Sequence, residues 1–174
     1  MQRLFLVGFM GCGKSATGRR VAAQLGWQFI DMDKFLENRF CKTVPELFME
    51  LGQAQFRRIE HQVLLELLAY EQVVVATGGG VACFYDNMQL MNAAGTTVYL
   101  QASPEQLTVQ LSTAKVERPL LKGKSEQELL LYVRQLLAER LEYYQQAQYT
   151  VVTSCDKSFS HVDTLIQLIN NQSF

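Results

Sequence analysis

The sequence has no pattern of cysteines that indicates disulfides or a bound metal. Its four cysteines, Cys12, Cys41, Cys83 and Cys155, form no C-x-x-C pair and no other metal-ligand spacing. We therefore expect free thiols in a reducing cytosol. The chain also has no internal repeat, no low-complexity tract and no linker long enough to separate domains. We expect one domain over residues 1–174, a length sufficient for one sizeable core.

Strong net charge and long apolar runs are also missing. The formal net charge is −1 and the pI about 6.1, so no basic field favours nucleic acid or an acidic membrane surface. No stretch approaches the ~18 apolar residues of a membrane span. The segment from Arg3 to Cys12 faintly resembles a signal peptide, but its apolar run is short and lacks a good cleavage site. We expect a cytoplasmic protein that binds neither nucleic acid nor membrane.

What the sequence does contain is a glycine-rich motif. Residues Gly8–Ser15 fit the pattern G-x-x-x-x-G-K-[ST]. The apolar run Leu4–Val7 before it predicts a buried strand, and Ser15–Leu25 after it predicts an amphipathic helix. In that setting backbone N–H groups and the helix dipole form an anion site, where Lys14 reaches the β- and γ-phosphates and Ser15 can ligate Mg²⁺. The motif predicts nucleotide binding; the alternative is a glycine-rich turn without a ligand.

Strand-like and helical segments alternate along the whole chain. This alternation predicts a parallel sheet covered on both faces. With a phosphate loop after the first of five strands, it indicates a three-layer α/β fold of the P-loop kinase type. The expected strands are Leu4–Val7, Phe29–Ile30, Val73–Ala76, Thr97–Leu100 and Tyr149–Val152. The expected helices are 14–25, 33–40, 44–51, 53–70, 86–94, 104–112, 126–147 and 161–171, with capping boxes at Thr43/Glu46, Ser103/Gln106 and Ser125/Glu128.

Asp31 and Asp33 follow a predicted strand at its carboxyl end. Such ends open onto the ligand crevice of an α/β sheet. Residues i and i+2 of an extended chain point the same way, so both carboxylates can face the site. One could hold Mg²⁺ through water while the other faces the acceptor hydroxyl. The alternative is that Asp33 caps the helix 33–40.

Two further segments are candidates for ligand contact. Gly78–Gly80 follow the third strand, where three glycines cost backbone entropy and are useful if the backbone approaches a ligand closely. Residues 114–124 are polar and basic, contain Arg118, and lie between two helices as a lid would. The alternative for Gly78–Gly80 is a flexible turn, and the alternative for residues 114–124 is a plain solvated connection.

Arg57, Arg118 and Arg140 could bind an anionic group, because a planar guanidinium fits a carboxylate or phosphate bidentately. Any one of them alone is more often a solvated surface residue.

The order and spacing of these motifs resemble the shikimate kinase family over essentially the whole chain. The residues that carry the resemblance are Gly8–Ser15, Asp31, Asp33, Phe56, Arg57, Glu60, Gly78–Gly80, Arg118–Leu121, Arg140 and Tyr144. The resemblance implies transfer of the γ-phosphate of ATP to the 3-hydroxyl of shikimate with Mg²⁺, in the chorismate pathway to aromatic amino acids. It also implies ATP and shikimate as the small-molecule partners, and we expect a monomer.

On the nucleotide side, the resemblance implies that Lys14 holds the β- and γ-phosphates and Ser15 the metal. Asp31 would support the metal through water, and Arg118 would swing in from the lid towards the transferring phosphate. The implied ATP-binding set is Gly11, Cys12, Gly13, Lys14, Ser15, Ala16 and Arg118.

On the acceptor side, the resemblance implies that residues 33–61 form the substrate-binding segment. Asp33 would bind the ring hydroxyls and accept the 3-hydroxyl proton, while Arg57 and Arg140 would clamp the carboxylate. Glu60 would orient Arg57. The backbone beside the ring would be that of Gly79 and Gly80.

Two positions depart from the family pattern. Gln53 stands where a glutamate is usual, and Leu111 stands where an arginine commonly stacks on adenine. We therefore expect adenine to be held by apolar contact and by the loop around residues 154–157.

Two other classes of function are open. A related small kinase could act on gluconate or a nucleoside monophosphate, although the arginines and Gly78–Gly80 favour a small anionic hydroxy acid. The chain could also be a catalytically silent nucleotide-binding module; such a module would be expected to lose Asp33, Arg57 or Arg140, and all three are present. The absence of an N-K-x-D motif disfavours a GTPase.

Overall fold

The computed structural model describes residues 2–113, 123–153 and 159–171. Its five strands form one parallel sheet in the order β2-β3-β1-β4-β5. Because β2, β3 and β1 are neighbours, the segments that follow them leave the sheet side by side at the same edge. The strands are β1 Arg3–Val7, β2 Gln28–Asp31, β3 Val73–Ala76, β4 Thr96–Gln101 and β5 Tyr149–Val152.

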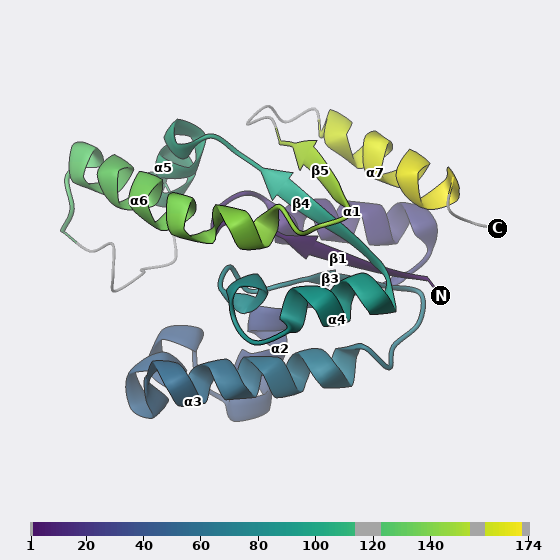
Figure 1. The fold of residues 1–174 in the computed structure, drawn as a ribbon, viewed down its shortest axis with the longest axis horizontal. Helices are drawn as coiled ribbons and strands as arrows, with labels where there is room; N and C mark the ends of the chain where they lie inside the picture. The colour runs from purple at the N-terminus through teal and green to yellow at the C-terminus, as the bar shows by residue number, and fades with distance from the viewer. Residues whose placement is uncertain (1, 114–122, 154–158, 172–174) are drawn as a thin grey trace.

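Helices cover both faces of the sheet, so the three-layer α/β prediction is confirmed. In Figure 1, α4 lies in front of the strands and α1 behind them, and α1 packs against α7. The helices are α1 Lys14–Leu25, α2 Met32–Phe40, α3 Val44–Leu67, α4 Asn87–Ala94, α5 Pro104–Thr113, α6 Glu126–Tyr144 and α7 Ser160–Asn171, with a short 3₁₀ turn, η1, at Val81–Cys83.

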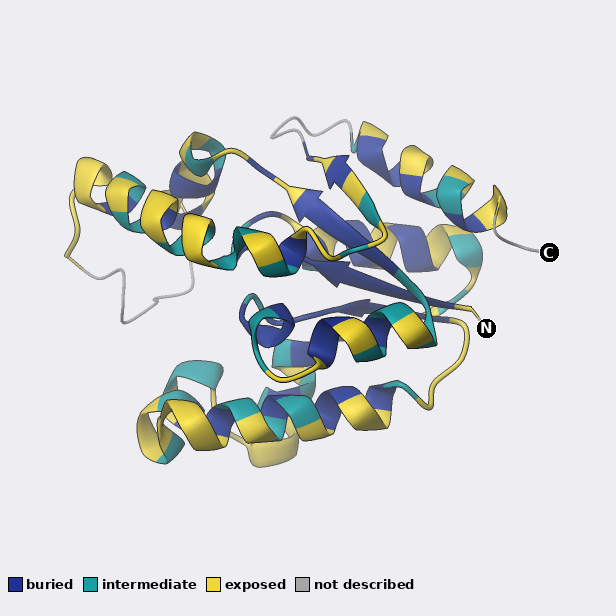
Figure 2. Cartoon of the chain, viewed as in Figure 1, coloured by how far each residue is buried: buried dark blue, intermediate teal, exposed yellow. Residues whose placement is uncertain are grey.

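The core lies along the central strands. Every residue of β1 and β3 is buried, as Figure 2 shows for the middle of the sheet. These strands have helices on both faces, which explains their continuous apolar sequence. Each buried Leu, Val or Phe stabilises the fold by about 1.5–3 kcal/mol relative to an exposed one. The sheet is thus a rigid platform for the loops at its carboxyl edge.

The predicted segments are confirmed, with differences at their ends. Two helices end earlier than the pattern indicated: α3 at Leu67 rather than 70, and α6 at Tyr144 rather than 147. In both cases the next residues form tighter turns, with backbone bonds from Tyr70 N–H to Leu67 O and from Ala147 N–H to Tyr144 O. The pattern did not predict η1.

The three predicted capping boxes are present. Thr43 with Glu46 and Ser125 with Glu128 make both reciprocal bonds. At the start of α5, Ser103 N–H donates to the Gln106 side chain over 3.0 Å, and Gln106 N–H donates back to the Ser103 hydroxyl over 3.2 Å.

Parts of two predictions lie outside the described residues. Of the predicted lid, the structure describes only Gly123 and Lys124, so Arg118 lies outside the described residues. The loop at 154–157, predicted to hold adenine, also lies outside them. Among the described residues, no helix combines the length and the apolar character needed to cross a bilayer.

The long helix α3 contains a kink at Gly52, which the sequence pattern placed between two separate helices. Gly52 has φ 72° and ψ 166°, a conformation essentially restricted to glycine. A Cβ there would meet no atom within 4 Å, so the cost of a side chain is purely conformational.

We predict that Gly52→Ala lowers the free energy of unfolding by about 1–3 kcal/mol, measured by urea denaturation. The neighbouring exposed residue serves as the control: Gln53→Ala should change the same free energy by no more than about 0.5 kcal/mol. Equal stability of Gly52→Ala and the unsubstituted protein would contradict the account of the kink.

Candidate active site

The loop after β1 is built around left-handed glycines. Gly8, Gly11 and Gly13 have φ values of 142°, 82° and 93°. A Cβ on Gly8 would lie 2.7 Å from the carbonyl oxygen of Leu100, so no other residue fits without moving β4. Gly13 caps α1 without a side-chain hydrogen bond, and the first turn of α1 has no acidic residue. The first-turn N–H groups therefore form an anion-binding terminus.

Lys14 lies against this loop and is buried, with 8% of its surface exposed. Its ammonium donates to the carbonyl oxygens of Gly8 and Phe9 over 2.7 and 2.8 Å, and lies 3.7 Å from the Cys12 sulfur. These contacts hold the charge within the loop, where β- and γ-phosphates would bind. Ala16, by contrast, is exposed.

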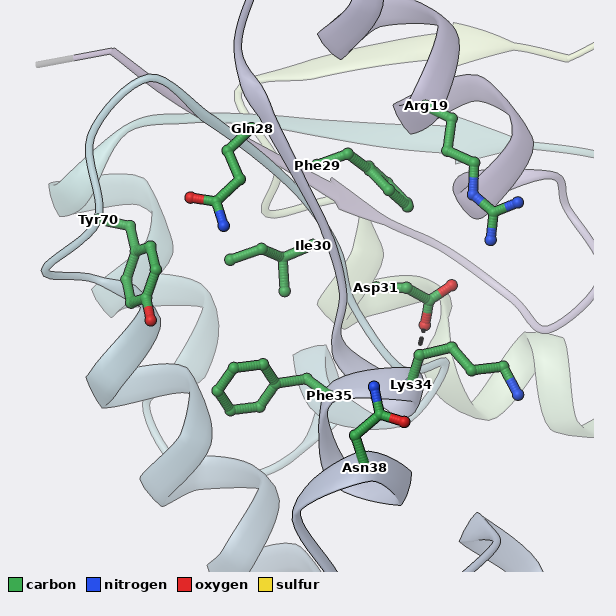
Figure 3. A pocket seen from close by; sticks show the side chains of 9 residues that line it. All are labelled: Arg19, Gln28, Phe29, Ile30, Asp31, Lys34, Phe35, Asn38 and Tyr70. Carbon is green, nitrogen blue, oxygen red and sulfur yellow. Dashed lines mark hydrogen bonds between the residues drawn. The ribbon is translucent and has the colours of Figure 1, made fainter. Parts of the chain in front are cut away.

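Asp31 connects the phosphate loop to α2. One carboxylate oxygen accepts a 2.5 Å hydrogen bond from the Ser15 hydroxyl. The other accepts from the backbone N–H groups of Asp33 and Lys34 over 3.1 and 3.3 Å; Figure 3 shows this carboxylate beside the first turn of α2. The helix thus begins at Met32 and Asp31 is its N-cap, so the alternative that Asp33 caps this helix is wrong.

Asp33 reaches the site from a helix rather than from an extended chain. The expectation that Asp31 and Asp33 point the same way, as residues i and i+2 of an extended chain do, is therefore wrong, because the chain turns helical at Met32. Asp33 nonetheless lies beside Gly78: a Cβ there would be 2.8 Å from Asp33 Oδ1 and 3.1 Å from Glu60 Oε1. Both carboxylates thus approach the first residue of the glycine run.

Arg57 is enclosed on several sides. Its Nη1 forms a short ion pair with Glu60, whose side chain is 3% exposed against 12% for that of Arg57. The guanidinium lies 4.5 Å from the centroid of the Phe84 ring. A Cβ on Gly80 would lie 2.5 Å from Nη1. A side chain at 80 would therefore displace the guanidinium from this position.

Burial raises the pKa of Glu60 to about 7. The cations of Arg57 and Arg140 oppose this rise, while the carboxylate of Asp33 adds to it. A carboxylate in such a position is sensitive to every charge placed in the site. Burial likewise raises the pKa of the nearby Cys83 thiol to about 11, so this thiol stays protonated at neutral pH.

Arg140, from α6, lies against Gly79, the middle residue of the glycine run. Its Nη1 donates to the carbonyl oxygen of Gly79 over 3.3 Å, and the hydroxyl of Tyr144 donates to the same oxygen over 2.6 Å. The two side chains thus meet at one carbonyl oxygen. A Cβ on Gly79 would lie 3.2 Å from the backbone nitrogen of Met10, so the glycine run also touches the phosphate loop.

The structure thus brings together Lys14, Ser15, Asp31, Asp33, Arg57, Gly78–Gly80 and Arg140 at one edge of the sheet. Two guanidiniums and the carboxylate of Asp33, beside an anion-binding loop, suit a small anionic hydroxy compound next to a nucleotide phosphate. Sequence reasoning missed Phe84, whose contact with Arg57 has no sequence signal. It also missed the hydrogen bond between His61 and Asn87.

Leu111 lies against the phosphate loop. It is buried, and its Cδ2 would be 3.3 Å from a Cβ on Gly11. This placement agrees with an apolar contact near the nucleotide, although adenine contact stays a prediction.

A separate hollow of about 360 Å³ lies along β2 and the start of α2 (Figure 3). Of the residues that the structure brings together at the sheet edge, it includes Asp31 and none of the others. Within residues 2–113, 123–153 and 159–171, no three His, Cys, Asp or Glu side chains are grouped to hold a metal by themselves.

Comparison with known proteins gives a consistent result. The family model described as shikimate kinase matches residues 10–170. A shikimate kinase of Bacteroides fragilis is 45% identical over 167 residues, which cover 96% of this chain and 93% of that protein. The crystal structure of shikimate kinase from Bacteroides thetaiotaomicron superimposes with a TM-score of 0.91 at 42% identity, covering 98% and 97% of the two chains. Shikimate kinase from Acinetobacter baumannii, solved in complex with shikimate, gives 0.88 at 32% identity over 100% and 96%.

The raised pKa of Glu60 predicts a pH-dependent stability. Between pH 4.5 and about 7 the folded protein binds a proton at Glu60 that the unfolded chain has released. The contribution of Glu60 to the free energy of unfolding is therefore fully present below pH 4.5 and is lost as the pH rises to about 7. Relative to Glu60→Gln, the unsubstituted protein should lose up to about 3 kcal/mol of unfolding free energy across this range, measured by urea denaturation.

Glu66→Gln is the matched control, because Glu66 lies in the same helix and pairs with Arg39 but is exposed. The Arg39 hydrogen bond lowers the pKa of Glu66 from 4.5, so its contribution is lost only as the pH falls below about 4.5 and should stay nearly constant as the pH rises from there to 7.5. A stability difference between the unsubstituted protein and Glu60→Gln that is constant from pH 4.5 to 7.5 would contradict the buried position of Glu60.

Proposed function

The chain belongs to the shikimate kinase family, and from this premise we propose that it transfers the γ-phosphate of ATP to the 3-hydroxyl of shikimate. The observation that carries the proposal is that Arg57 and Arg140 lie against the neighbouring glycines Gly80 and Gly79, next to the phosphate loop. A silent nucleotide-binding module would have no use for this acceptor site.

The shikimate carboxylate would bind between the two guanidiniums. Glu60 pairs with Arg57, the ring of Phe84 lies against the same guanidinium, and the carbonyl of Gly79 orients Arg140. A preorganised bidentate contact loses little side-chain entropy on binding. The backbone of Gly79 and Gly80 would lie beside the ring.

Asp33 would bind the ring hydroxyls and accept the proton of the 3-hydroxyl. Its place in the first turn of α2, beside Gly78, supports this role. Phosphoryl transfer needs little covalent help, so orientation of the hydroxyl in line with the γ-phosphate is the main requirement.

ATP would bind on the phosphate loop, at residues Gly11–Ala16, with Lys14 neutralising the β- and γ-phosphates. Mg²⁺ fits the oxygen donors of Ser15 and Asp31, because this ion keeps several waters and takes few protein ligands besides phosphate. When bound it would spread the charge that develops on the transferring group. Arg118, from the lid segment at about 114–124, would approach the same phosphate.

The proposal includes the remaining expectations. We propose one domain over residues 1–174 that works as a monomer in the cytoplasm, with the substrate segment at about 33–61. The single continuous sheet, which carries both the phosphate loop and Asp31, supports the one-domain arrangement.

The test of substrate identity is ADP release from ATP·Mg²⁺ with and without shikimate. We predict that shikimate stimulates ADP release at least tenfold, whereas gluconate and nucleoside monophosphates do not. Stimulation by gluconate or a nucleoside monophosphate instead would reassign the acceptor, and stimulation by none would favour the silent module.

The carboxylate clamp predicts that Arg57→Lys and Arg140→Lys each raise the shikimate KM by about tenfold or more, because an ammonium loses the bidentate geometry. The KM for ATP should change less than about twofold. Arg58→Lys is the control, since Arg58 is the exposed neighbour of Arg57. An unchanged shikimate KM in either variant removes that arginine from the clamp.

A further inference from the structure

The position of the Arg57 guanidinium depends on the two ends of the turn η1. Gly80 precedes η1 and lies directly against the guanidinium, while Phe84 follows η1 and places its ring 4.5 Å from it. Glu60 holds the guanidinium from its own helix, α3. A shift of η1 relative to α3 would therefore change the space that Arg57 occupies.

The side chain of Asn87 holds η1. This residue begins α4 and is 1% exposed. Its Nδ2 donates to the carbonyl oxygen of Val81 over 2.7 Å, inside η1. Its Oδ1 lies 2.6 Å from Nδ1 of His61. The two polar atoms of this buried amide thus bond to two different elements: the nitrogen to η1 and the oxygen to α3.

His61 lies one turn after Arg57 on α3. The hydrogen bond between Asn87 and His61 therefore connects η1 to the helix that carries Arg57. Since Nδ2 of Asn87 donates to Val81, the oxygen of the amide faces the imidazole, and His61 must carry a proton on Nδ1. The ring of Tyr85 covers the imidazole, with centroids 4.9 Å apart.

We propose that Asn87 and His61 are positioning residues for the acceptor carboxylate, because together they fix the distance between α3 and η1 and so set the slot that holds Arg57. The identity of that acceptor rests on the proposed function. Among the described residues, the hydrogen bonds and ring contact given for these two side chains lie on α3, η1 and Tyr85, away from the phosphate loop, so their loss should weaken acceptor binding selectively.

The first test is steady-state kinetics on Asn87→Ala. We expect the shikimate KM to rise about tenfold, with the ATP KM changed less than about twofold. The matched control is Asn92→Ala. Asn92 lies on the same helix and also bridges two segments, through Thr97 and the carbonyl of Gln146, but away from the site. Its loss should lower Tm without changing the shikimate KM.

A second pair of variants distinguishes the effect of losing the His61 hydrogen bond from the effect of changing the size of the side chain. His61→Phe keeps a ring but loses the donor, whereas His61→Asn places an amide donor near the position of Nδ1. We expect the higher shikimate KM in His61→Phe and partial rescue in His61→Asn. If Asn87→Ala does not fold, this pair decides the question.

The third readout is independent of activity. The Nε–H of Arg57 is buried, and its ¹⁵N NMR signal can be assigned by its loss in Arg57→Lys. In the ligand-free protein we expect one sharp signal that shifts or broadens in Asn87→Ala but not in Asn92→Ala. If the unsubstituted protein shows no shikimate-dependent turnover, the proposed function fails and this comparison alone decides the positioning role. An unchanged signal together with an unchanged shikimate KM in Asn87→Ala would overturn the inference.

Discussion

The buried ion pair between Arg57 and Glu60 is the interaction on which the geometry of the acceptor site depends. Two charges can be held this far from water only if each has its partner, and removal of one partner typically costs about 3–5 kcal/mol. The pair lies against the loop after β3: a Cβ on Gly80 would meet Arg57, and a Cβ on Gly78 would meet Asp33 and Glu60. Side chains at these positions would displace the charged groups of the acceptor site.

The strand order explains how the remaining groups meet the pair. In the order β2-β3-β1, three neighbouring strand ends lead into Asp31, the glycine run and the phosphate loop. Asp31 bonds both to Ser15 on the nucleotide side and to the backbone of Asp33 on the acceptor side. One carboxylate thus ties the two halves of the site together, and the glycine run contacts both halves through Met10 and Arg57.

The parts of this site that could be predicted from the sequence are those whose residues lie close together along the chain. The phosphate loop was predictable because its glycines, lysine and serine act within eight residues. Asp33 was identified as a site residue, but the sequence pattern placed it on an extended chain. In the structure Asp31 caps the helix, so the chain is already helical from Met32 and Asp33 lies in the first helical turn. Phe84 and Asn87 have no local signal, since their roles arise only when α3 and η1 pack together.

The central claim is that two fixed guanidiniums bind the carboxylate of a small hydroxy acid, and a binding isotherm tests it most directly. Calorimetry would compare shikimate with its methyl ester, which keeps the ring and its hydroxyls but has no charge. Charge-assisted bidentate contacts predict at least about a hundredfold weaker binding of the ester. Equal affinity for acid and ester would contradict the assignment of Arg57 and Arg140 as a carboxylate clamp.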